Sequence, residues 1–167
     1  FSDLKDEDKW ILTKYEKMIK SVTKHMEKYE FNLVGAEVYD FVWNYFCDYY
    51  IEMAKYSIDR KTTKSTLCYV LSGILKVLHP FMPFVTEEIF QILPVKDSCS
   101  IMISDYPKYN KKNVFDDTEV VIDDIILFIK NFRNVKLENN ITKDLKVLFD
   151  TISNNDLVIK MLKLDGS

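Results

Sequence analysis

Apolar residues recur every three or four positions along most of this chain, which is the spacing of one face of an α-helix. The first such stretch covers residues 6–29 and predicts a long amphipathic helix. Its apolar positions are Ile11, Leu12, Tyr15, Met18, Ile19, Val22, Met26 and Tyr29. Its other face carries Lys14, Lys17, Lys20, Lys24 and Lys28. Such a lysine face is either a solvated surface or a surface that meets RNA.

The second stretch, residues 32–57, is apolar almost all round. A narrow polar strip at helical spacing interrupts it, formed by Asp40, Asn44, Asp48 and Glu52. A helix of this kind is usually the central one of a bundle. We therefore expect a central helix with Asn32 as its N-cap, Trp43 in the core, and a polar strip that joins neighbouring helices. A ligand edge, an RNA edge or plain exposure are the alternatives for the strip.

Two prolines mark a sharp corner between two further helices. Pro80 lacks a backbone donor and disfavours the α conformation of His79, so the helix that follows the polar link at residues 59–64 should stop there. Pro83 has the fixed φ that suits a first helical turn, and it opens a short helix that ends before Pro94. Glu87 and Glu88 lie near this new N-terminus, where the helix dipole favours negative charge. Residues 1–95 are thus predicted to form an all-α bundle.

Residues 96–167 are predicted to form a second, smaller α/β unit. Residues 99–104 alternate like a strand and residues 105–113 read as a loop. Asp116 and Glu119 have the spacing of a capping box ahead of a helix that reaches about Leu137. A strand at 145–149 and a helix at 156–164 complete the unit. The predicted fold class is therefore mainly α, a helical bundle followed by a small α/β subdomain.

The composition is that of a globular protein: 167 residues, of which 47% are hydrophobic and 29% charged. No apolar run approaches the roughly 18 residues of a membrane span, and the N-terminal residues do not read as a signal peptide. We therefore expect a cytoplasmic location. Cys47, Cys68 and Cys99 are odd in number and form no C-x-x-C pair, so we expect reduced, mostly buried thiols and no metal site.

The sequence contains no recognisable motif for catalysis. The glycines are Gly35, Gly73 and Gly166, so neither a Walker loop nor a G-x-G-x-x-G turn can be built to hold nucleotide phosphates. His25 and His79 stand far from any recognisable nucleophile motif. We expect no active site and no cofactor within this chain.

Binding of RNA is the chemistry that the residues allow. The formal net charge of −3 is unlike that of a domain that grips nucleic acid alone, so contacts must come from local basic faces. Lys and Arg can neutralise phosphates and release counterions. The first candidate surface is Lys130, Arg133 and Lys136 with the amides Asn134, Asn139 and Asn140, and the second is Lys14, Lys17 and Lys24. The alternative for both is the solvated face of an amphipathic helix.

Three segments carry a family resemblance: Trp10-Ile11-Leu12, residues 43–55, and Leu78-His79-Pro80-Phe81-Met82-Pro83-Phe84 with the residues up to Pro94. They resemble the anticodon-binding region of class I aminoacyl-tRNA synthetases, most closely the valyl-tRNA synthetase family. The proline string is shared with isoleucyl enzymes, whereas Phe46-Cys47-Asp48-Tyr49-Tyr50-Ile51-Glu52 points to valine.

The resemblance implies a monomeric tRNA-binding region of a larger enzyme that joins valine to its tRNA with ATP and Mg²⁺. The ATP-site motifs of the family do not occur in this chain, and the main anticodon-reading helix is expected upstream of Phe1. Two alternatives stay open. One is the same region of an isoleucyl-tRNA synthetase, and the other is a non-catalytic helical protein-interaction module, which the acidic balance favours.

Overall fold

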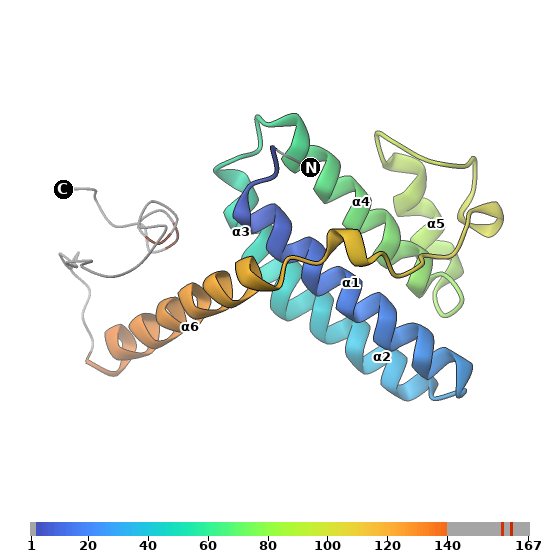
Figure 1. Ribbon diagram of the computed structural model, residues 1–167. Coiled ribbons are helices and arrows are strands. Elements are labelled where there is room, and N and C mark those ends of the chain that lie inside the picture. Colours follow the sequence, from blue (N-terminus) through green and yellow to red (C-terminus); the bar gives the residue numbers. More distant parts are fainter. Residues whose placement is uncertain (1–2, 140–157, 159–160, 162–167) are drawn as a thin grey trace.

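The computed structural model describes residues 3–139 together with residues 158 and 161. The elements of this part are α1 (Asp6–Glu27), α2 (Phe31–Asp40), the π-helical segment η1 (Phe41–Tyr50), α3 (Ile51–Lys55), α4 (Lys61–Leu78), α5 (Pro83–Ile92), the 3₁₀ turns η2 (Ile101–Ile103) and η3 (Lys111–Asn113), and α6 (Asp116–Glu138). No strand occurs within residues 3–139 (Figure 1). The mainly α fold class is confirmed, whereas the small α/β subdomain is not seen.

Helix α1 lies at the centre of the packing and contacts α2, η1, α4 and α6 (Figure 1). Its apolar stripe is buried, and Trp10, Ile11, Ile19 and Val22 have no exposed surface. The helix ends at Glu27, two residues before Tyr29, whose left-handed φ of 60° turns the chain into α2. The predicted first helix is therefore confirmed, and it is this helix that is central.

The expectation of a central helix over 32–57 was wrong. Residues 31–55 do form consecutive helical elements, but they bury one side only, and all four residues of the polar strip are exposed. Asn44 donates to Asp40 at 2.6 Å on this surface. The first turn begins at Phe31 behind Glu30, without a side-chain cap, so Asn32 does not serve as the N-cap.

The π-helical geometry of η1 explains why Trp43 is not in the core. Hydrogen bonds from residue i to i+5 widen the helix, so the face that meets α1 no longer follows the α-helical spacing. Phe41 and Phe46, five residues apart, are both buried, whereas Trp43 is 56% exposed and stacks on Tyr39 with ring planes 3° apart. Trp10 and Tyr50, in contrast, lie in the core and have no exposed surface.

The proline corner is built as predicted in its main features. Helix α4 ends at Leu78, and Pro83 occupies the first turn of α5. His79 nevertheless keeps α-helical angles, with φ −54° and ψ −40°, so Pro80 does not force it out of that region. The His79 ring nitrogen Nδ1 lies 2.8 Å from Thr86 Oγ1, which ties the end of α4 to the first turn of α5.

The segment after α5 forms no strand. Ile101 is buried against Leu75, Phe90 and Leu93, while Met102 and Ile103 are exposed. A strand requires a partner to satisfy its backbone, and residues 3–139 offer none. The Glu87 carboxylate instead accepts from the Ile101 amide and the Ser100 hydroxyl, each at 3.0 Å, and so holds this segment on α5.

Helix α6 begins at Asp116 behind Phe115, again without a side-chain cap, so the predicted capping box was wrong. The strand at 145–149 and most of the helix at 156–164 lie outside the described residues. Val158 and Met161 are described, and both belong to the same core cluster as α1 and α6. The domain boundary at residue 95 stays a prediction.

The structure also bears on membrane-spanning helices, on the burial of the cysteines and on metal ligands. No helix of the described part is long and apolar enough to cross a membrane. Cys47 and Cys68 are half-buried and Cys99 is exposed, so the expected burial of the thiols was wrong. Among the described residues, His, Cys, Asp and Glu do not form a group of three or more that could hold a metal ion.

Candidate nucleic-acid interface

Buried polar groups on α1 fasten the connection between α5 and α6. Glu16 has no exposed surface, and its carboxylate accepts from the Asn110 amide at 2.7 Å, from Asn113 Nδ2 at 2.9 Å and from the Tyr69 hydroxyl at 3.3 Å. Three residues earlier, Thr13 Oγ1 accepts from the Phe115 amide at 2.9 Å. Since buried carboxylates are costly unless hydrogen-bonded, these contacts specify where the 105–115 segment lies.

The lysine face of α1 is divided between two roles. Lys14 Nζ lies 2.7 Å from Asp123 and 2.9 Å from Glu119, and Lys17 pairs with Glu119 and Asp116. Burial lowers the pKa of Lys14, but hydrogen bonds to the two carboxylates outweigh it and leave the pKa above its ordinary value. These lysines therefore hold α6 on α1, and Lys24 is the candidate of this face that stays exposed without an ion pair among the described residues.

Helix α6 extends away from the other helices in its second half (Figure 1). Its first turn is acidic, whereas Lys130, Arg133 and Lys136 lie in its C-terminal part, and Lys136 lies in the last turn, where the helix dipole favours cations. We call these three residues the α6 ridge. Arg133 and Asn134 are exposed, and Lys136 is half-buried.

Two ridge residues also have partners within the protein. Lys130 Nζ lies 5.4 Å from the ring centroid of Tyr49 on η1, and Arg133 Nη2 donates to the Met161 carbonyl at 3.3 Å. Asn139 donates to the Val135 carbonyl at 2.8 Å, and Asn140 lies outside the described residues. The predicted basic surface therefore lies on the C-terminal part of α6, and contacts within the protein hold two of its side chains, Lys130 and Arg133, in position.

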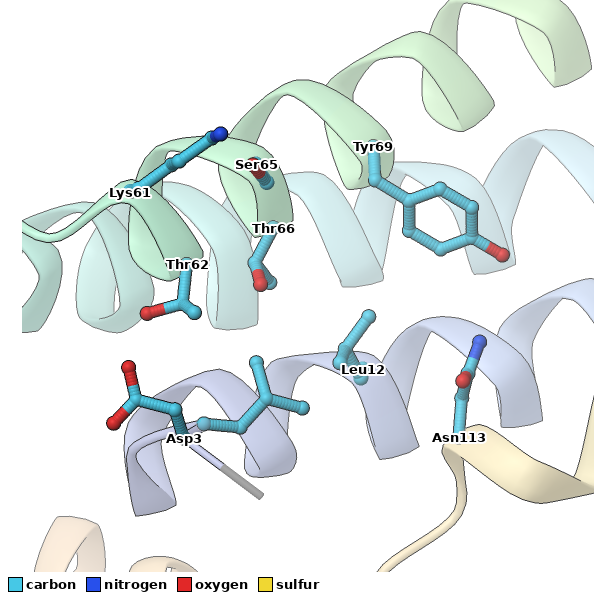
Figure 2. A pocket seen from close by; sticks show the side chains of 9 residues that line it. Asp3, Leu12, Lys61, Thr62, Ser65, Thr66, Tyr69 and Asn113 are labelled. Carbon is cyan, nitrogen blue, oxygen red and sulfur yellow. The ribbon is translucent and has the colours of Figure 1, made fainter. Parts of the chain in front are cut away.

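Two cavities flank α4, and sequence reasoning did not identify either. The first, about 580 Å³, lies between α1 and α4. Figure 2 shows Thr62, Thr66 and Tyr69 of α4 across from Leu12 of α1 and Asn113 of η3. The second, about 710 Å³, lies between α4 and the segment 94–108.

The residues shared by the two cavities are Lys61, Ser65 and Tyr69. The sequence analysis had assigned Lys61 and Lys64 to a polar link, but α4 begins at Lys61. A four-residue spacing of Lys61, Ser65 and Tyr69 was the available signal, since it places the three side chains on one helix face.

Comparison with protein families agrees with this architecture. Residues 8–151 match the model of the anticodon-binding domain of tRNA ligases. The chain belongs to this family.

Individual relatives narrow the similarity to one kind of ligase. The chain is 43% identical to the valine–tRNA ligase of Staphylococcus saprophyticus over 142 residues, 81% of this chain and 16% of that protein. It is 41% identical to the valine–tRNA ligase of Bacillus cereus and 35% identical to that of Petrotoga mobilis, over 168 and 169 residues. Each of these two alignments covers 96% of this chain and 19% of the relative. The chain thus spans less than a fifth of the length of these relatives.

Proposed function

We propose that this chain is the anticodon-binding region of a valine–tRNA ligase and that it positions valine tRNA for aminoacylation by other domains of a longer protein. The observation that carries the proposal is the match of residues 8–151 to the anticodon-binding family, together with valine–tRNA ligase relatives that align with 96% of the chain. A cytoplasmic, monomeric protein is part of the proposal.

We propose that contacts to the phosphate backbone of the tRNA orient it on this domain. In protein–RNA recognition, base edges and stacking in unpaired loops supply sequence identity, whereas cations on phosphates supply affinity. On α6, the ridge offers three cations, and its packing on Tyr49 and the Met161 carbonyl limits the freedom of two of them. Side chains held in advance lose less entropy on binding than free ones do.

A binding titration with transcribed valine tRNA at several salt concentrations tests this role of α6. The variant K130A/R133A/K136A should lower the log–log salt slope by about 2 to 3, since each lost phosphate contact removes about 0.7 to 0.9. The control K5A/K55A/K112A removes the same charge from exposed positions elsewhere. An unchanged slope in the ridge variant would overturn this role of α6, and Lys24 on α1 would then be the next surface to test.

The identity of the amino acid is tested with a second RNA. Isoleucine tRNA should bind more weakly than valine tRNA to the chain. Tighter binding of isoleucine tRNA would favour an isoleucyl enzyme instead, and no binding of either tRNA would favour the non-catalytic interaction module.

We also propose that amino-acid activation, with its ATP and Mg²⁺, takes place outside these 167 residues. The support is the sequence itself, which has three glycines and no phosphate-binding loop. The chain alone should show no valine-dependent exchange of pyrophosphate into ATP. Robust exchange would overturn this part of the proposal.

A further inference from the structure

The cavity between α4 and residues 94–108 carries a positive charge in an acidic protein. Four lysines and two aspartates line it: Lys61, Lys64, Lys76, Lys108, Asp97 and Asp105. Lys76 and Asp97 form an ion pair with each other. Within the part of the chain that the structure describes, no ion pair occupies Lys61, Lys64 or Lys108. The chain as a whole has a net charge of −3, so this local excess of unpaired cations favours an anionic occupant.

Aromatic side chains lie beside these lysines. Tyr15, Tyr69 and Tyr106 line the same cavity, and the rings of Tyr15 and Tyr69 meet edge to face with centroids 5.4 Å apart. Tyr69 is 44% exposed and Tyr106 is 37% exposed, so both present surface to an occupant. Proteins that bind single-stranded nucleic acid combine such rings, which stack on bases, with cations that meet the phosphates.

A nucleotide joins these two requirements in one molecule. Its base has a face for stacking on the tyrosines, and its phosphate carries negative charge for the lysines. The two cavities share the row Lys61, Ser65 and Tyr69 (Figure 2 labels all three), so one strand crossing this row reaches both. Base-paired RNA keeps its bases stacked inside the helix, and a cavity of about 710 Å³ has the size of a small-ligand site. Unpaired nucleotides are therefore the form of RNA that fits.

We propose that this α4 groove, defined by Lys61, Lys64, Ser65, Tyr69, Tyr106 and Lys108, binds an unpaired segment of the tRNA. Phosphates lie on the lysines and a base lies against the tyrosines. The inference rests on the proposed function, because it assigns a second contact surface for the same RNA, separate from the α6 ridge.

The test is a salt titration of the 167-residue chain with an anticodon stem-loop RNA, using the variant K64A/K108A. Loss of two contacts to single-stranded RNA should lower the log–log slope by about 1.4. If the contribution vanishes at about 1 M salt, this slope corresponds to roughly 25-fold weaker binding at about 0.1 M. The control K5A/K55A removes two exposed lysines elsewhere and should bind as the unaltered chain does. Thermal unfolding of both variants checks that each is folded.

Photo-crosslinking identifies the contact directly. An RNA with 5-bromouridine at the loop positions should form adducts on Tyr69 or Tyr106, and a fully paired duplex should form none there. Unchanged slope and no tyrosine adduct, with the α6 ridge variant still defective, would overturn the groove and leave the proposed function standing. Absence of all RNA binding, or displacement of the RNA by acidic peptides alone, would overturn both.

Discussion

Glu16→Gln tests whether buried hydrogen bonds on α1 decide where the connection to α6 lies. The Glu16 side chain is fully buried and accepts three hydrogen bonds, from Asn110, Asn113 and Tyr69. The amide of Gln has nearly the same shape as the carboxylate of Glu. One of the two carboxylate oxygens is replaced by an NH₂ group, which cannot accept a hydrogen bond. Either the Asn110 amide or the pair Asn113 and Tyr69 then faces a donor.

The expected cost follows from that mismatch. A hydrogen bond to a charged group contributes about 1.5–3 kcal/mol, and a buried donor without a partner costs about 1–3 kcal/mol. We expect a loss near 2 kcal/mol, which lowers the unfolding midpoint by roughly 4–8 °C for a protein of this size. Urea unfolding followed by circular dichroism measures the change, and hydrogen exchange at the Asn110 amide reports on the segment itself.

Glu27→Gln is the matched control, because Glu27 lies on the same helix and is exposed. It should unfold within about 0.5 kcal/mol of the unaltered chain, as surface changes usually do. If Glu16→Gln were as stable as this control and the Asn110 amide kept its protection, the reasoning from buried acceptors would be refuted.

Two further predictions concern aromatic residues. Trp43→Ala should change the unfolding free energy by less than about 1 kcal/mol, because more than half of the side chain is exposed. Trp10→Ala should cost about 3–5 kcal/mol, because Trp10 is fully buried. Equal midpoints of the two variants in thermal melting would contradict the assigned burial. Burial, with the nearby carboxylate of Glu16, raises the pKa of Tyr69 to about 12. The folded state therefore holds this proton more tightly, so its contribution to stability is complete below pH about 10 and is lost as the pH rises toward about 12. Ultraviolet titration of Tyr69→Phe against the unaltered chain should show the loss of one phenol that ionises near pH 12. Loss of a phenol that ionises near pH 10 would contradict the raised pKa.

Local sequence signals determined the helices and the family. The three-to-four residue spacing over residues 6–29 and the prolines at positions 80 and 83 act on neighbouring backbone, so their effect could be predicted without knowing the fold. The same holds for the resemblance carried by residues 78–94, which the match over residues 8–151 confirmed.

Tertiary structure decided which surfaces are free. Lys14 looked like any lysine of a solvated face, yet its partner Asp123 lies 109 positions away in the chain. Trp43 is exposed rather than buried because η1 adopts π-helical geometry, and a prediction based on the α-helical repeat does not account for that geometry. The groove beside α4 brings Lys64 and Lys108 together although 44 positions separate them. Charge pairing, burial and cavities depend on contacts between distant segments, and the pattern of residues along the chain does not contain those contacts.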